Sequence, residues 1–148
     1  MEGGAQSPQM VQRRKRTEVK LAQAESAAPD VIVDFIFDDG LFFISISNIS
    51  DKPAYKVAVK FECKLLGPGG KDIAALPLFR NIEFLAPHKE IVTFLDSSGS
   101  YFSRGGPTKV SARVSYQDFQ GTRKVATINH DLEIYREIGF IRRPGSSD

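Results

Sequence analysis

Hydrophobic and polar residues alternate along much of this chain with the two-residue period of β-strands. The clearest case is residues 56–64, where Val57, Val59 and Phe61 alternate with lysine and glutamate residues. Such alternation indicates a strand with one buried face and one solvent-exposed face. The same period recurs over residues 109–117, which predicts a second strand of the same kind.

Weaker patterns complete the series of predicted elements. Residues 31–37 and 41–48 are predicted as the two strands of a hairpin, because the Asp38-Asp39-Gly40 segment between them is typical of a tight turn. Residues 91–95 and 123–130 are predicted as shorter strands. Residues 73–84 contain a proline, so they are predicted as an edge strand or an irregular crossing segment. Residues 96–107 are rich in Gly and Ser and are predicted as the longest loop, and no helix is expected after Pro29.

About seven short strands with turns every 8–12 residues are typical of an all-β, antiparallel, immunoglobulin-like β-sandwich. A small closed barrel is the competing architecture. The sandwich is predicted over residues 30–136, after a flexible basic N-terminal arm (residues 1–29) that forms at most a transient helix, and before a frayed tail (residues 137–148). The predicted core consists of Phe42, Ile44, Ile46, Val57, Val59, Phe61, Val110, Ala112, Val114 and Ile128.

Composition excludes several classes of protein. The chain has 148 residues, of which 41% are hydrophobic and 26% charged, and this is ordinary for a globular domain rather than a collagen, a coiled coil or a disordered chain. Its one cysteine, Cys63, cannot form an intrachain disulfide and is predicted to be a small buried apolar residue. Neither a signal peptide nor an apolar run of about 20 residues is found, so a cytoplasmic location is the default expectation.

Charge is concentrated at the start of the chain. Residues 1–20 carry five Lys or Arg against two Glu, and the remainder is close to neutral. Four of these cations are adjacent, Arg13, Arg14, Lys15 and Arg16, and they could contact nucleic acid, an anionic membrane or an acidic protein surface. No aromatic residue lies beside them to stack on bases, so sequence-specific reading of nucleic acid is not expected. The near-neutral remainder predicts no basic face on the folded body.

Three short segments have the character of turns between strands. Residues 48–57 combine a strand-ending Asn, a polar turn and a Pro-Ala pair before a Val-rich strand, and residues 85–91 contain Leu-Ala-Pro with His88 where glycine is usual. Residues 114–121 place Asp and Gly around a late hairpin turn. Together these segments resemble prokaryotic immunoglobulin-like β-sandwich domains of the cell-adhesion and fibronectin type III kinds, over about residues 30–136. The resemblance implies a structural or adhesive role and carries no catalytic residue.

The residues that usually carry chemistry form no catalytic or metal-binding pattern. His88 and His130 lack the ligand spacing of metal sites, and Ser97 or Ser98 lacks a nucleophile elbow. The aspartates at strand ends are explained by turn formation. The sequence therefore predicts a protein that is not an enzyme, with no cofactor, no metal and no small-molecule substrate.

Four aromatic residues are the candidate contacts for a protein partner. Phe43 falls on the nominally polar face of its strand, and Tyr101, Phe102 and Phe119 fall in predicted loops. Exposed aromatics of this kind anchor protein partners, and the alternative is a second small core beneath the long loop.

These features predict a non-enzymatic protein-binding or assembly module, which uses loop aromatics and an edge strand to bind another protein or a second copy of itself. The alternative is nucleic-acid or anionic-surface binding through the arm (Arg13, Arg14, Lys15, Arg16). A virion or filament subunit, in which an arm threads onto its neighbour, is a further alternative. A carbohydrate-binding sandwich is the last, because Tyr55, Tyr101 and Tyr116 could stack on sugars.

Overall fold

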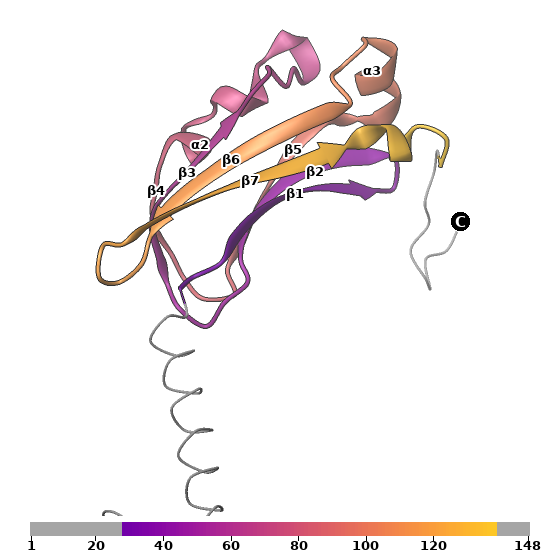
Figure 1. Ribbon diagram of the computed structural model, residues 1–148. Helices are drawn as coiled ribbons and strands as arrows, with labels where there is room; N and C mark the ends of the chain where they lie inside the picture. Colours follow the sequence, from indigo (N-terminus) through magenta and orange to yellow (C-terminus); the bar gives the residue numbers. More distant parts are fainter. Residues whose placement is uncertain (1–27, 139–148) are drawn as a thin grey trace, which may run out of the picture.

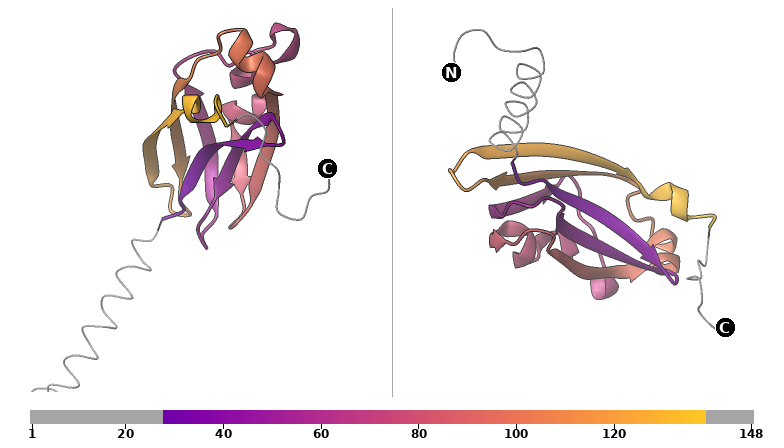
Figure 2. Two further views of the ribbon diagram at one scale, coloured as in Figure 1. Left: turned by 90° about the vertical axis from the view of Figure 1, so that its right-hand side faces the viewer. Right: turned by 90° about the horizontal axis from the view of Figure 1, so that it is seen from below.

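Seven strands of the computed structural model pair into two antiparallel sheets that pack face to face (Figures 1 and 2). The structure describes residues 28–138. One sheet has three strands in the order β1-β2-β5, and the other has four in the order β4-β3-β6-β7. The strands are β1 (Val31–Asp38), β2 (Leu41–Asn48), β3 (Ala54–Phe61), β4 (Ile82–Leu85), β5 (Glu90–Ser97), β6 (Lys109–Gln117) and β7 (Arg123–Asp131). The predicted all-β sandwich is confirmed, and the two sheets remain separate rather than closing into a barrel.

The hairpin β1–β2 forms where the sequence predicts it. Asp39 and Gly40 have positive φ values of 55° and 76°. When both central residues of a two-residue hairpin turn have positive φ, the turn matches the right-handed twist of the flanking strands. Asp-Gly is a favoured pair for such a turn. The register then places Ile36 opposite Phe43 and Asp38 opposite Leu41.

The four-stranded sheet carries an irregularity near one end. Its register shifts between Tyr55 and Ala58, where Lys56 has a φ of 52°. The shift leaves one extra residue on β3 relative to β6, which is a β-bulge. A β-bulge bends its strand and raises the local twist. Beyond the shift, Lys60 lies opposite Arg113, and both belong to the side of the sheet that faces away from the core.

The core lies between the sheets and matches the prediction closely. Eight of the ten predicted core residues are buried, and Phe61 and Ile128 are half-buried but pack against the same cluster. Their alternation along each strand directs them inward, which is the physical basis of the sequence pattern. Cys63 lies two residues beyond the end of β3, half-buried against this core.

The connections contain short helices that the sequence interpretation missed. Residues 73–84 begin with η2 (Ile73–Ala75) and α2 (Pro77–Arg80), and only β4 at their end is an edge strand. The predicted loop of residues 96–107 contains α3 (Ser98–Ser103). Each of these three helices starts at a residue that favours a helix N-terminus. Asp72 before η2 and Ser97 before α3 each accept a hydrogen bond from a backbone amide of the helix. Pro77 lies in the first turn of α2, where no amide donor is needed. The remaining short helices are η1 (Pro68–Gly70) and η3 (Leu132–Tyr135).

The two ends of the described segment leave from opposite ends of the sandwich (Figure 1). Most of the predicted basic arm (residues 1–29), including Arg13, Arg14, Lys15 and Arg16, lies outside the described residues. The same is true of the predicted frayed tail (residues 137–148) beyond residue 138.

Candidate functional site

The outer face of the three-stranded sheet carries an unusual row of apolar side chains. Ile36 on β1 lies opposite Phe43 on β2, which in turn lies opposite Phe94 on β5. The rings of Phe43 and Phe94 meet edge to face with their centroids 5.7 Å apart. Val92 extends the row along β5, and Phe94 and Val92 are 41% and 44% exposed. We call this set of four residues the apolar face.

The apolar face departs from the usual pattern of a sandwich, in which outward positions along each strand are polar. Contiguous exposed apolar side chains of this kind mark interaction surfaces. Its charged neighbours are acidic: Asp34 on β1 and Glu90 on β5 are exposed, and the three strands contain no Lys or Arg. The face is therefore suited to a partner that is both apolar and basic.

Of the predicted partner contacts, Phe43 and Phe119 are placed where a partner could reach them. Phe43 is half-buried within the apolar face, and Phe119 is 83% exposed at the β6–β7 turn. That turn is held by Asp118, whose carboxylate accepts hydrogen bonds from the amides of Gln120 and Thr122. The structure does not bring Phe119 and Phe43 together, because they belong to different sheets.

Tyr101 is a core residue, so its prediction as an exposed loop aromatic is wrong. It is 1% exposed in α3, its hydroxyl donates to the carbonyl oxygen of Pro107, and burial raises the pKa of that hydroxyl. Its ring fills the space above Gly106, where a Cβ atom would come within 2.7 Å of it. The ring of Tyr101 packs against Phe42 in the core between the sheets, so the alternative predicted from the sequence, a second small core beneath this segment, is also wrong for Tyr101.

Phe102 belongs to the same cluster, but part of its side chain remains exposed to solvent. Its ring packs edge-on against Phe42 at 5.6 Å, and the guanidinium of Arg136 covers it at 4.5 Å from the ring centre. This cation–π contact occupies the ring from outside. Because Arg136 already covers part of the ring, Phe102 is not a strong candidate for contact with a partner.

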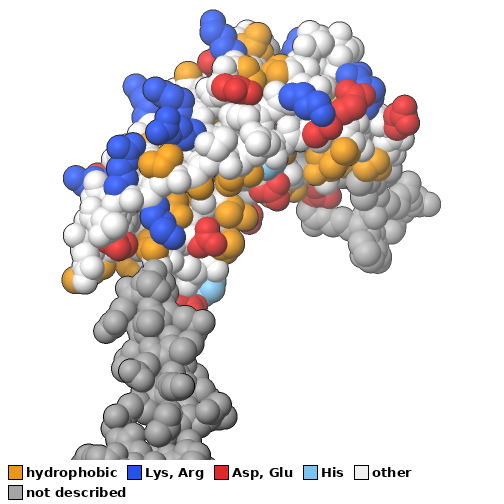
Figure 3. All heavy atoms as spheres, viewed as in Figure 1, with side chains coloured by type: hydrophobic (Ala, Val, Ile, Leu, Met, Phe, Trp, Pro, Cys, Tyr) orange, Lys and Arg blue, Asp and Glu red, His pale blue; other side chains and the backbone are white. Residues whose placement is uncertain are grey.

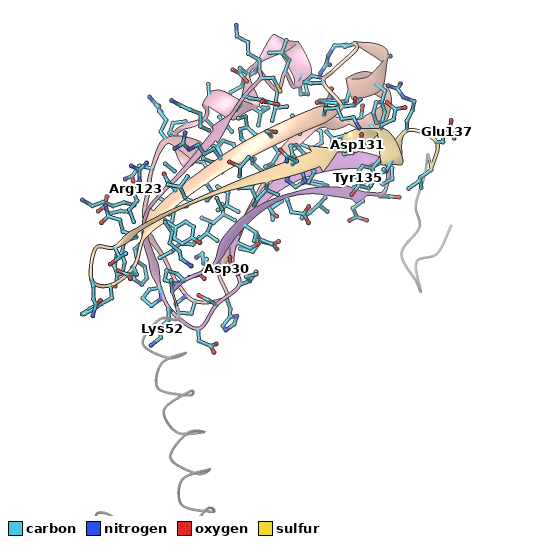
Figure 4. All side chains as sticks on the ribbon, in the orientation of Figure 1. Asp30, Lys52, Arg123, Asp131, Tyr135 and Glu137 are labelled. Carbon is cyan, nitrogen blue, oxygen red and sulfur yellow. The ribbon has the colours of Figure 1, made fainter. Side chains whose placement is uncertain are left out.

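A second surface lies on the outside of the four-stranded sheet. Four cations from four elements, Lys60 on β3, Arg80 on α2, Arg113 on β6 and Arg123 on β7, line one open pocket of about 410 Å³. Figure 3 shows Lys and Arg side chains gathered beside α2, and Figure 4 shows Arg123 at the opposite end of β7 from Asp131. The expectation that the body has no basic face is wrong, because net charge does not report how a sheet register groups the charges.

Both histidines considered as metal ligands make contacts within the fold. His130 donates from Nε2 to the carbonyl oxygen of Val33 at 2.9 Å, joining β7 to β1, and His88 pairs with Asp51 at the surface. Burial and nearby carboxylates raise the pKa of the Cys63 thiol, which lowers its reactivity at neutral pH. Within residues 28–138, no group of three or more His, Cys, Asp or Glu side chains is arranged to hold a metal ion. The described part of the chain also contains no helix with the length and hydrophobicity to cross a membrane.

The fold and its surfaces define an all-β sandwich with one apolar, acidic outer face and one basic outer pocket. Residues 8–136 match the model of a family described as a domain of unknown function (DUF8453), and the chain belongs to that family. The match includes most of the basic arm as well as the sandwich. Comparison with curated proteins gave no match.

Proposed function

We propose that this chain is a non-enzymatic assembly module, in which the apolar face of one copy receives the basic arm of a second copy. The observation that carries the proposal is the apolar face itself: Phe43, Phe94 and Val92 remain accessible on the outside of the sandwich. Burying such side chains against a partner contributes roughly 25 cal/mol for each Å² removed from water.

Charge favours the arm as the occupant of this face. The face is bordered by Asp34 and Glu90, and the run Arg13 to Arg16 supplies four adjacent cations. Opposite charges around an apolar contact guide orientation and raise the rate of association. The family match spans the arm and the sandwich together, which is consistent with the two acting as one unit. Exchange of a segment between identical copies is a low-cost route to assembly.

The strand arrangement supports the proposed kinship with immunoglobulin-like domains. The first, second and fifth strands share one sheet, and the third, sixth and seventh share the other, as in the immunoglobulin fold. The fourth strand pairs with the third here. Domains of this architecture commonly serve adhesion and assembly, although fold alone does not determine function. The cytoplasmic location and the absence of catalysis remain predictions.

Sedimentation velocity of the full chain over a wide range of concentration tests the proposal. We expect the average mass to rise with concentration, and Phe94→Ser to shift the protein toward monomer. Arg14→Glu combined with Arg16→Glu should do the same, and added salt should weaken association because it screens exposed charges. Leu66→Ser is the matched control, since Leu66 is 42% exposed but lies outside the apolar face.

Two results would overturn this function. The first is a wild-type protein that stays monomeric at every concentration. The second is a loss of association in Leu66→Ser as large as that in Phe94→Ser, which would mean that the apolar face has no specific part in it.

A further inference from the structure

The basic pocket brings together four cations that are far apart in the sequence. Its walls come from β3, β6, β7 and α2, and its lining residues are Ala58, Val59, Lys60, Phe79, Arg80, Arg113, Ser115 and Arg123. The lining contains no carboxylate, and within residues 28–138 the acidic side chains that form ion pairs do so with other groups. A neighbouring hollow shares Lys60, Phe79 and Arg80 with it, and its own lining includes the carboxylates of Glu62 and Asp72.

The backbone positions of three of these cations are fixed by the fold. Lys60 and Arg113 lie directly opposite each other on paired strands. Arg80 follows Phe79, which is 1% exposed and packs edge-on against Phe61 at 5.2 Å, so α2 is anchored where it projects Arg80. The backbone of the pocket is therefore preorganised, whereas the long cationic side chains become ordered only when a ligand binds.

This grouping of charges is unfavourable for the isolated fold. Like charges directly opposite each other on adjacent strands destabilise a sheet, and Lys60 and Arg113 form such a pair. Arg80 and Arg123 add two more cations to the same pocket, and no carboxylate belongs to its lining. An anion bound among the four would remove the repulsion and gain charge-assisted hydrogen bonds from the guanidinium groups.

We propose that this pocket binds a compact ligand with several phosphate groups, free in solution. Guanidinium groups match phosphate oxygens with paired hydrogen bonds, Lys60 adds a compact charge, and the Ser115 hydroxyl can donate one more. Four cations around one pocket exceed what one phosphate needs, and a volume of about 410 Å³ is within the range of small-molecule sites. The accessible aromatic surface needed to stack a base is absent from the lining, where the one aromatic residue is the buried Phe79. This inference does not depend on the assembly function proposed above.

Tripolyphosphate is a suitable probe, and titration calorimetry of the full chain at matched ionic strength is the test. We expect saturable binding to wild type and a loss of about tenfold or more in affinity for Arg113→Gln. Lys89→Gln is the matched control, because it removes one charge from a residue outside the pocket. A variant with all four arm cations, Arg13 to Arg16, changed to Gln should still bind tripolyphosphate.

Thermal unfolding without ligand gives a second and independent measurement. Because Arg113→Gln removes the repulsion of Lys60, this variant should be at least as stable as wild type while it loses ligand-induced stabilisation. A protein that merely lost structure would show the opposite change in the absence of ligand. Tripolyphosphate should raise the melting temperature of wild type and Lys89→Gln by similar amounts.

Several outcomes would overturn the proposal. They are no saturable binding at matched ionic strength, equal binding by wild type and Arg113→Gln, and loss of binding in the arm variant alone. Binding of a single-stranded oligonucleotide or of vesicles with an anionic phospholipid, without binding of tripolyphosphate, would also overturn it and assign the cations to a macromolecular surface.

Discussion

The side-chain amide of Asn48 donates a hydrogen bond to the carbonyl oxygen of Leu85 at 3.1 Å, and this bond joins the two sheets of the sandwich. Asn48 ends β2 in the three-stranded sheet, whereas Leu85 ends β4 in the four-stranded sheet. The same amide donates to the carbonyl of Lys52, and its oxygen accepts from the amide and hydroxyl of Ser50. One buried side chain thus organises a turn and closes one end of the sandwich.

Replacing Asn48 should therefore be costly. We expect Asn48→Ala to lower the free energy of unfolding by about 2–4 kcal/mol, because each buried polar group left unpaired costs about 1–3 kcal/mol. Asn48→Asp should be no milder, since a carboxylate cannot donate to the carbonyls of Lys52 and Leu85. Urea denaturation measures both variants. Asn129→Ala is the control, because it removes one exposed hydrogen bond, and an equal effect of the two alanine variants would contradict this role.

The opposite end of the sandwich depends on Phe42. This residue is fully buried, and its ring contacts the rings of Phe37, Tyr101, Phe102 and Tyr135 at 5.4–5.7 Å. Phe42→Ala should lower the free energy of unfolding by about 3–5 kcal/mol, through lost burial and a cavity. Phe119→Ala removes an equal ring from an exposed position and should change stability by less than about 0.5 kcal/mol. Similar urea midpoints for the two variants would refute the assignment of Phe42 as the centre of this cluster.

The buried hydroxyl of Tyr101 predicts alkaline sensitivity. Burial raises its pKa in the folded state, and an unfolded tyrosine ionises near pH 10. The stability that this group contributes is present below about pH 10 and is lost as pH rises further. Tyr101→Phe should lose about 1 kcal/mol near neutral pH with the hydrogen bond to Pro107, but its stability should fall less steeply above about pH 10. Urea unfolding at several alkaline pH values measures this, and parallel curves for the two proteins would count against it.

His88 occupies a backbone conformation that favours glycine. Its φ is 59°, at the position where the resembling turns usually carry Gly. Left-handed backbone costs a residue with a Cβ about 1–2 kcal/mol, and the exposed pair of His88 with Asp51 contributes little. We expect His88→Gly to be at least as stable as wild type and more stable than His88→Ala by about 1 kcal/mol. Thermal unfolding of the three proteins decides, and a less stable glycine variant would show that the pair with Asp51 outweighs the strain.

Local sequence patterns were sufficient to predict most strands and most of the core. Val57, Val59, Val110 and Val114 are buried because strict alternation forces every second side chain to the same face of a strand. The hairpin turn at Asp39 and Gly40 was predictable for a similar reason, since few residues adopt positive φ at low cost. The helices η2 and α2 were missed although Asp72 and Pro77 favour helix starts, because each helix is too short to show a periodic pattern.

The surfaces were harder to predict because they depend on contacts between distant segments. Phe43 was identified from its own strand, but its neighbour Phe94 lies about fifty residues later, and only strand pairing brings the two rings together. Tyr101 was misjudged because a Gly- and Ser-rich segment predicts an exposed loop, whereas α3 turns this residue inward over Gly106.

The sequence alone determined that this protein is built from about seven antiparallel strands, since the two-residue period and the turn residues act over a few neighbouring positions. That the strands form two separate sheets rather than a closed barrel was decided by pairing between distant segments. Tertiary structure decided which outward-facing side chains share a surface. The pairing of β3 with β6 sets Lys60 beside Arg113, and α2 and β7 bring Arg80 and Arg123 to the same pocket. A near-neutral body thereby acquires a basic site, because the charge of a chain is a sum over residues whereas a binding site depends on where the fold places them.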